Sequence, residues 1–389
     1  MKKIVATIVV WLAGVAVASA QPQPFNFVET ASISTHSAPR GIVAADFDLD
    51  GHLDFAVAGI DQPSHDIVIW FGDGHGSFGR PINISLNQPG AGPFSIAAGD
   101  LNHDGHPDLA VALADIDRIA IFTWRGSGFT RLPDIVFDAP ANPRQIVIAD
   151  VNRDGNNDIV ATLYERGTVL VMSGDGTGLK WASTRETDAV GRGAHGLAVA
   201  DIDGNGQLDL IVTNALTNRV WVLLFSSPIG ASLAQSFPVG SSPRNVVVTD
   251  LNHDLHPDLA VVNTESHSLT FYFWNPASDD DEDAALFIDR HDIAVGSSPR
   301  DVVSADFDGN GGNDVAVASY ANNSVVAIPG YEAVGETAFG RYTATSFTNP
   351  RSLAIGDFDE DGRPDILIAN QGNGFVRLWA NRTPFALRP

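Results

Sequence analysis

Apolar residues along the chain fall in short runs that recur at a nearly constant interval. In the first unit an apolar run at residues 41–45 is followed by an acidic nonapeptide and then by a second apolar run at residues 55–58. Both runs are rich in Val, Ile and Ala with little alternation, which is typical of strands buried on both faces. A polar turn leads to a third run at residues 66–71, and a more polar fourth segment closes each unit, as residues 235–239 do in the fourth. The pattern predicts four short antiparallel strands per unit.

The acidic nonapeptide occurs seven times and sets the repeat. Its copies span residues 46–54, 100–108, 150–158, 201–209, 250–258, 306–314 and 357–365. Successive copies begin 49 to 56 residues apart, which is the size of a four-stranded propeller blade. We therefore predict an all-β chain in which residues 21–389 form a single seven-bladed β-propeller of four-stranded antiparallel blades.

The two ends of the repeat region predict how the ring closes. Only ten residues follow the third strand of the last unit, residues 375–379, whereas residues 25–34 precede the first unit and resemble a strand without a blade. We predict that this N-terminal strand completes the last blade and leaves no exposed sheet edge. The fifth unit also carries an acidic insertion at residues 278–283, interpreted as a solvated loop, with an accessory cation site as the alternative.

Residues 1–20 have the pattern of a secretory signal peptide. Two lysines precede an apolar run from Ile4 to Val17, and small residues at 18–20 predict cleavage before Gln21. A membrane anchor is the alternative, but the run is shorter than the roughly 20 residues that a span requires. The chain contains no cysteine, so disulfides and lipoprotein attachment are excluded. We expect a secreted or periplasmic protein.

The formal net charge of −24 restricts the partners. Close to half of the Asp and Glu residues lie in the nonapeptides, and an acidic surface argues against nucleic acid and anionic membranes. We expect no nucleic-acid binding, no membrane insertion and a monomer, with carbohydrate or a surface protein as the ligand.

The nonapeptides place oxygen atoms as a calcium loop does. Carboxylates or amides stand at positions 1, 3, 5 and 9, a glycine at position 6 permits a sharp turn, and position 7 offers a backbone carbonyl. All-oxygen ligands favour calcium over zinc or copper, while magnesium would require octahedral geometry with several waters. An EF-hand is excluded because position 12, where it needs glutamate, is apolar in every copy. Up to seven structural Ca²⁺ ions are expected, although polar turns tied by Asx hydrogen bonds are an alternative.

The predicted metal ligands can be given loop by loop. They are Asp46, Asp48, Asp50, His52 and Asp54; Asp100, Asn102, Asp104, His106 and Asp108; Asp150, Asn152, Asp154, Asn156 and Asp158; Asp201, Asp203, Asn205, Gln207 and Asp209; Asp250, Asn252, Asp254, His256 and Asp258; Asp306, Asp308, Asn310, Gly312 and Asp314; and Asp357, Asp359, Asp361, Arg363 and Asp365. Residues at position 7 act through the backbone.

The loops differ in ways that predict different affinities. The first and seventh keep all four carboxylates and are expected to bind tightest. The fifth has Leu255 in place of glycine, which costs about 1 kcal/mol or more if that position needs a positive φ, so it is expected to bind weakest. Four loop histidines are expected to face solvent instead of serving as zinc ligands or bases: His103, His106, His253 and His256.

These features resemble the FG-GAP/VCBS repeat family, whose repeats build the seven-bladed propeller of integrin α subunits. The resemblance spans residues 25–380 and is carried by the nonapeptides and by a Gly-rich turn at residues 71–78 that recurs at 173–178. It implies acidic loops that join the first and second strands and bind calcium, with ligands on the opposite face. The chain departs from integrins because all seven units carry calcium-type loops and no leg domains follow. Integrin-like adhesion is therefore not implied, and related propellers include lectins and polysaccharide lyases.

A Pro-Arg pair precedes the first strand in five units, on the face expected to hold a ligand. The second unit has Pro93-Phe94 there, and the fourth has Ala194-His195. The candidate ligand-binding residues are Arg40, Arg144, His195, Arg244, Arg300 and Arg351. Guanidiniums at a channel mouth could capture a carboxylate or phosphate. Alternatively each arginine ties down carbonyls or an aspartate of a neighbouring blade, which we favour because a feature repeated across blades usually serves the blade.

Other residues give little support for catalysis. Five tryptophans in third strands are expected to pack between blades, with stacking on sugars as the alternative: Trp70, Trp124, Trp221, Trp274 and Trp379. No nucleophile elbow, zinc-protease helix or phosphate-binding loop is present. We therefore expect an exported, calcium-stabilised binding module. The alternative is a polysaccharide-active enzyme, a lyase or hydrolase, with its site at the arginine-lined mouth.

Overall fold

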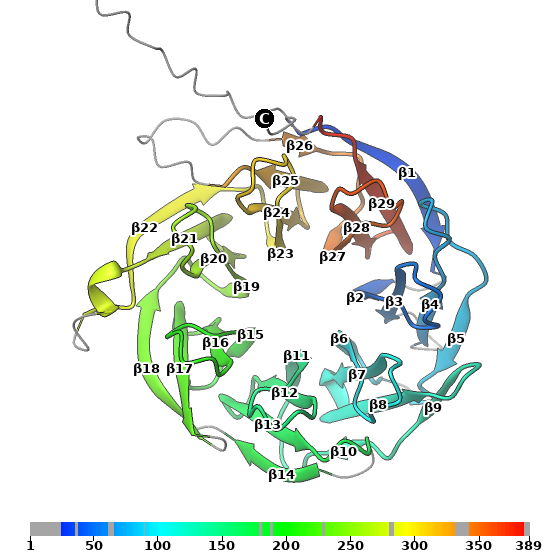
Figure 1. Ribbon diagram of the computed structural model, residues 1–389, viewed down its shortest axis with the longest axis horizontal. Helices are drawn as coiled ribbons and strands as arrows, with labels where there is room; N and C mark the ends of the chain where they lie inside the picture. The colour runs from blue at the N-terminus through cyan, green and yellow to red at the C-terminus, as the bar shows by residue number, and fades with distance from the viewer. Residues whose placement is uncertain are drawn as a thin grey trace, which may run out of the picture.

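Seven antiparallel sheets stand in a ring, each with its first strand nearest the centre (Figure 1). The computed structural model describes residues 25–35, 38–60, 66–88, 90–178, 181–186, 190–227, 230–279, 284–330 and 342–384. The expected signal peptide and most of the expected acidic insertion lie outside these residues. Among the described residues there is no helix long and apolar enough to span a membrane.

The four strand positions of a blade recur with little change in length. The innermost strands are β2 (Pro39–Ala45), β6 (Pro93–Gly99), β11 (Pro143–Ala149), β15 (Ala194–Ala200), β19 (Pro243–Thr249), β23 (Pro299–Ala305) and β27 (Pro350–Gly356). The second strands are β3 (Asp54–Gly59), β7 (Asp108–Leu113), β12 (Asp158–Leu163), β16 (Asp209–Asn214), β20 (Asp258–Asn263), β24 (Asp314–Ser319) and β28 (Asp365–Asn370). The third strands are β4 (Asp66–Trp70), β8 (Arg118–Trp124), β13 (Thr168–Gly174), β17 (Arg219–Ser227), β21 (Ser268–Trp274), β25 (Ser324–Ile328) and β29 (Phe375–Asn381).

The outer strands are the least regular. They are β5 (Ile82–Ser85), β9 (Phe129–Arg131) with β10 (Ile135–Val136), β14 (Trp181–Glu186), β18 (Gly230–Pro238), β22 (Phe287–Ala294), β26 (Tyr342–Ala344) and β1 (Phe27–Ser34). The second blade departs from the expected four strands, because β9 and β10 pair separately with β8. Pro133 lies between them and has no N–H for the ladder, which accounts for the break. Two short 3₁₀ turns, η1 (Ala114–Ile116) and η2 (Pro276–Asp279), complete the described elements.

The ring closes through the N-terminal strand, as the sequence predicts. β1 pairs antiparallel with β29 and forms the outer edge of the last blade, in the order β1-β29-β28-β27 (Figure 1). The seven-bladed, all-β fold is therefore confirmed, together with the strand that completes the seventh blade.

The core is divided among the interfaces between blades. The described residues form seven apolar clusters, and each takes its residues from two adjacent blades, including the first and the seventh. Every residue of all seven second strands is buried. The first strands were expected to be equally buried, but their C-terminal halves, which lead into the acidic loops, are only partly buried. Small side chains such as alanine and valine suit these crowded inner positions.

Candidate functional site

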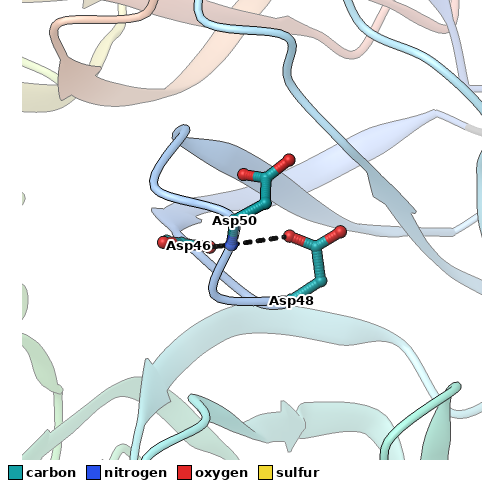
Figure 2. A group of neighbouring side chains, drawn as sticks. All are labelled: Asp46, Asp48 and Asp50. Carbon is teal, nitrogen blue, oxygen red and sulfur yellow. Dashed lines mark hydrogen bonds between the residues drawn. The ribbon is translucent and has the colours of Figure 1, made fainter.

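Each acidic nonapeptide connects an innermost strand to the second strand of its blade, where the sequence placed it. The first loop follows β2, and the carboxylates of Asp46, Asp48 and Asp50 project from a single turn of the chain (Figure 2). The N–H of Asp50 donates to Asp46 at 3.2 Å and to Asp48 at 3.3 Å. The turn therefore gathers the first three predicted ligands of this loop.

Hydrogen bonds of the Asx type shape all seven loops identically. The N–H of position 6 donates to the carboxylate of position 1 at 2.7–3.0 Å in every copy. Position 6 has a positive φ throughout, between 69° at Leu255 and 94° at Gly51 and Gly311. Position 6 therefore does need a positive φ, which was the condition for the predicted cost at Leu255.

Three carboxylates approach one another closely in four of the loops. One oxygen or more from each lies within 4.8 Å of the others in the sets Asp46, Asp48 and Asp50; Asp201, Asp203 and Asp209; Asp306, Asp308 and Asp314; and Asp357, Asp359 and Asp361. The other three loops carry asparagine at position 3, so an amide oxygen replaces one carboxylate there. Hard divalent cations accept both kinds of oxygen.

Unpartnered oxygens show that the residues fit a cation. Buried oxygens of Asp201, Asp306 and Asp359 have no hydrogen-bond partner among the described residues. Polar turns tied by Asx bonds would leave such atoms unexplained, because a buried carboxylate oxygen without a partner is costly. An oxygen-preferring divalent cation would satisfy them. The donor set therefore suits Ca²⁺, with the carboxylates and amides at positions 1, 3, 5 and 9 as its ligands.

The aspartate at position 9 has a second task within the blade. One of its oxygens accepts the N–H of position 2 at 2.8–3.1 Å in all seven loops. The other accepts an N–H at the end of the third strand at 2.7–2.9 Å. Since a carboxylate oxygen has two lone pairs, these bonds leave room for a metal. Position 9 thus links the loop to the second and third strands.

Burial of these aspartates raises their pKa values, and facing carboxylates add to the effect. The pKa rises to about 6 at Asp108, Asp158, Asp209 and Asp258, to about 7 at Asp54 and Asp365, and to about 8 at Asp314. The backbone N–H donors oppose the shift without cancelling it. A bound cation favours the ionised form and would lower these values again.

Neighbouring loops contact one another through position 7. His52 of the first loop pairs with Glu360 of the seventh at 2.5 Å, and His103 of the second bonds Asn156 of the third at 2.7 Å. His106 contacts the carbonyl of Phe47 in the preceding loop at 3.0 Å. Side chains at position 7 therefore join blades, which is compatible with the backbone carbonyl as the predicted ligand.

The seventh loop differs because arginines contact its acids. Arg382 donates to Asp359 at 2.5 Å and to Asp361 at 2.6 Å, and Arg363 also donates to Asp361 at 2.9 Å. These guanidiniums occupy part of the acceptor capacity at positions 3 and 5. They compete with a cation for the loop that sequence alone predicts to bind among the tightest.

All four loop histidines were expected to face solvent, but two of them are packed against tryptophans. The ring of His106 stacks on Trp124 with centroids 5.7 Å apart, and His256 stacks on Trp274 at the same distance. Both histidines are partly buried because the indoles of the third strands extend beneath the loops, whereas His103 and His253 are exposed. Trp124, Trp274 and Trp379 are buried, as the packing interpretation predicts.

The Pro-Arg pairs begin the innermost strands, at the end opposite the acidic loops. The second residues of these strands are Arg40, Phe94, Arg144, His195, Arg244, Arg300 and Arg351. All but Arg144 line one cavity of about 150 Å³ on the ring axis, together with polar residues such as Asn245, Asp301 and Ser352. The structure therefore brings together the candidate ligand-binding residues, with Arg144 just outside the cavity lining.

Phe94 lies in the middle of the arginines. The guanidinium carbons of Arg40, Arg144, Arg244 and Arg351 lie 4.5–5.5 Å from the centre of its ring. Arg144 also lies 5.0 Å from the ring of Tyr164, and Arg300 lies 5.1 Å from Tyr320. Phe94 is not among the candidate ligand-binding residues predicted from sequence; its place as the second residue of an innermost strand was the signal that could have identified it.

The arginines lack the partners that a purely structural role predicts. Among the described residues, the buried Nε atoms of Arg40, Arg144 and Arg300 have no hydrogen-bond acceptor. Arg351 donates to Gln371 at 3.3 Å. Within the described part of the chain, the ion pairs join His52 or other arginines to carboxylates and include none of the five arginines of the Pro-Arg pairs. The favoured interpretation, arginines tying down carbonyls or an aspartate, does not match this geometry.

Burial and mutual repulsion act on the cluster together. Burial, followed by the charges of Arg40 and Arg300, lowers the pKa of Arg351 to about 9. Burial likewise lowers the pKa of Arg244, with four other guanidiniums contributing. Guanidiniums keep their proton in proteins. The lowered pKa values therefore mean that the positive charges of Arg244 and Arg351 are destabilised by their surroundings.

Asp301 and His195 are engaged with their neighbours. Asp301 accepts hydrogen bonds from Asn245, from Ser352 at 2.9 Å and from the N–H of Leu353 at 2.8 Å. The Nδ1 of His195 lies 3.0 Å from the carbonyl of Arg244. Burial, and then Arg244, lower the pKa of His195 well below its usual range, so this ring is neutral at physiological pH.

A family model of the FG-GAP-like repeat matches residues 46–111, 105–161, 150–212 and 306–368, which is more than half of the chain. No curated protein matches the sequence.

Several solved structures are similar in fold. A streptogramin B lyase is 13% identical over 92% of this chain and 97% of its own, with a TM-score of 0.60. Virginiamycin B lyase from Staphylococcus aureus is 14% identical over 92% and 99%, with a TM-score of 0.61. A structure of BBS1N in complex with ARL6DN is 14% identical over 92% and 98%, with a TM-score of 0.63. At these identities the likeness concerns the fold alone.

Proposed function

The chain belongs to the FG-GAP-like repeat family, and on that premise we propose that it is an exported, calcium-stabilised β-propeller that acts as a binding module. Its ligand is a carbohydrate or a surface protein. The observation that carries the proposal is the separation of charge along the inner strands. An arginine begins most of them and an acidic loop follows each, roughly 20 Å apart along a strand.

The acidic face supports the structural role of calcium. Its carboxylates converge in four loops, and three buried carboxylate oxygens lack partners among the described residues. Without a cation these charges repel one another. With one, the position-9 aspartates connect each ion to two strands of the blade. Calcium would therefore stabilise the ring without taking part in chemistry.

The opposite face supports ligand binding over catalysis. A polar cavity opens there, and its guanidiniums offer donors that the described residues do not use. Of the titratable groups in the lining, Asp301 accepts hydrogen bonds from Asn245 and from the N–H of Leu353, and His195 is buried with its Nδ1 against the carbonyl of Arg244. Two of the similar structures are lyases with the same fold, so a polysaccharide-active enzyme is the alternative function.

Thermal unfolding tests the calcium step. The chain without residues 1–20 is melted in calcium, in magnesium and in EGTA, and bound metal is counted by mass spectrometry. We expect a large, calcium-specific rise in melting temperature with six or seven ions bound. Equal melting temperatures in all three conditions, without bound metal, would remove calcium from the proposal.

A separate experiment tests the binding step. The calcium-loaded protein is applied to a glycan array and to immobilised surface proteins, with turnover of polysaccharides measured in parallel. Saturable binding without turnover supports the module, whereas release of unsaturated or hydrolysed sugars would establish the enzyme instead.

A further inference from the structure

Four arginines surround one small cavity at the axis of the ring, and the buried Nε atoms of Arg40 and Arg300 have no acceptor among the described residues. Arg40, Arg244, Arg300 and Arg351 line it, and each comes from a different blade. Convergence from separate blades means that the ring as a whole fixes the geometry. No flexible loop is needed to bring the groups together, so the site is formed in advance.

From this geometry we infer that the cavity binds a small oxyanion carrying two negative charges, such as phosphate or a phosphate monoester group. The inference rests on the proposed function in one respect, since it names the chemistry of the group that the binding face recognises. Guanidiniums bind such groups bidentately through paired N–H donors. The anion would also supply acceptors for the buried Nε atoms of Arg40 and Arg300.

The size of the cavity restricts the ligand. Its volume of about 150 Å³ is below the roughly 300 Å³ at which pockets for drug-sized molecules begin. A volume of this size suits a single phosphate group, either free or at the end of a larger ligand that lies outside the mouth.

The local charge favours a dianion over a monocarboxylate. The described acid in the lining is Asp301, and its oxygens accept hydrogen bonds from Asn245, Ser352 and backbone. His195 adds no positive charge. Even with Asp301 ionised and Asp115 acting on Arg40, the four guanidiniums leave the site with a net positive charge. Two negative charges offset their repulsion better than one, because each additional charge interacts with all four.

Packing on Phe94 does not remove the need for an anion. Cation–π contacts contribute about 0.5–1 kcal/mol each at exposed sites. Phe94 lies 5.2–5.5 Å from the guanidinium carbons of Arg40, Arg244 and Arg351, and an aromatic ring offers their N–H groups no strong acceptor.

Calorimetry on the full propeller tests the inference. Calcium-loaded protein is dialysed into calcium-free buffer, which prevents precipitation, and titrated with sodium phosphate. Sodium acetate and sodium chloride at matched ionic strength serve as comparators. We expect one phosphate per chain, with acetate bound at least tenfold more weakly. Absence of phosphate binding, or equal effects of chloride, would overturn the inference.

Two variants separate recognition from folding. Arg244→Gln is expected to weaken phosphate binding by about tenfold or more, while Arg125→Gln, which removes the same charge from an exposed turn, leaves it unchanged. In phosphate-free buffer Arg244→Gln should melt at or above the wild-type temperature, because it relieves repulsion. If Arg244 were purely structural, the Arg244→Gln variant would melt at a lower temperature than wild type and would still bind phosphate. If Arg244→Gln does not fold, Arg40→Gln provides the same test.

A further arm identifies the source of the group. Glucose 6-phosphate binding as tightly as inorganic phosphate would indicate a group on a larger ligand, and binding of inorganic phosphate alone would indicate the free anion. Either result supports the site. The calcium dependence of melting is recorded on the same samples. If phosphate does not bind but calcium still stabilises the protein, only this inference is rejected and the proposed function stands.

Discussion

Phe27 stacks on Trp379 with ring centroids 4.5 Å apart and ring planes inclined by 21°. The first residue of the first strand thereby contacts the third strand of the last blade, more than 350 residues later. Phe307, from the loop of the sixth blade, packs edge-on against Phe27 at 5.6 Å. The closure of the ring therefore depends on an aromatic cluster as well as on the β1–β29 ladder.

Phe27→Ala is expected to lower the free energy of unfolding by about 3–5 kcal/mol, the usual range for removing a buried phenylalanine. Phe27 is 4% exposed, whereas its neighbour Val28 is 45% exposed on the other face of the strand. Val28→Ala therefore serves as the control and should change little. Denaturant unfolding in saturating calcium measures both, and equal losses would show that the strand pairing alone closes the ring.

The repeat made most of the fold predictable from sequence. Seven nonapeptides at a constant interval give the number of blades, and the spare strand at residues 25–34 gives the closure. The loop hydrogen bonds follow from the residue types, because an aspartate at position 1 and a glycine at position 6 form an Asx turn. These features are local, and local chemistry can be read along the chain.

Other features depend on contacts between blades and gave no such signal. Position 4 of every loop also has a positive φ, yet it is a glycine only in the fourth and sixth loops. Residues such as Leu49, His103 and Glu360 occupy it elsewhere, so the residue type does not mark the conformation. The pairing of Arg382 with the seventh loop and the gathering of arginines around Phe94 need the closed ring. The sequence predicts correctly which end of the strands the arginines occupy. It does not predict that they lack partners, because this is a property of the assembled cavity.

Leu255→Gly is expected to stabilise the protein by about 0.5–1 kcal/mol. Leu255 has a φ of 69° and is 91% exposed, so the change removes no packing. Avoiding a left-handed penalty of about 1–2 kcal/mol outweighs the greater chain entropy of glycine, about 0.5–1 kcal/mol. Chemical denaturation measures the gain, and calcium titration should show tighter binding. Leu255→Ala keeps the Cβ atom and should gain nothing, so an equal gain there would assign the effect to the exposed side chain.

Arg382→Gln is expected to increase calcium stabilisation at the seventh loop. The substitution removes the guanidinium that bonds Asp359 and Asp361, so both carboxylates become available to a cation. The rise in melting temperature between EGTA and calcium should be larger for this variant than for wild type. Arg125→Gln removes the same charge from an exposed residue that forms no ion pair among the described residues, so it should behave as wild type. A smaller rise in the Arg382 variant would mean that the arginine supports the loop instead of competing for it.

His195 predicts a specific loss of stability in acid. Its pKa lies below the usual 6.5 in the folded protein because the ring is buried beside Arg244 and Arg144, and an unfolded chain restores the usual value. The unfolded state therefore binds the proton more readily, so the stabilisation is complete above pH 6.5 and is lost as the pH falls below it. Between pH 7.5 and pH 5 the loss from this residue alone is up to about 2 kcal/mol.

His195→Asn isolates that contribution, because the asparagine Nδ2 can still donate to the carbonyl of Arg244 while carrying no titratable group. Unfolding free energies of both proteins are measured in denaturant at pH 7.5 and at pH 5, in saturating calcium. The aspartates titrate in both proteins and cancel in the comparison. We expect the wild type to lose more stability than the variant on acidification. Equal losses would mean that the imidazole accepts its proton within the folded ring despite the neighbouring guanidiniums.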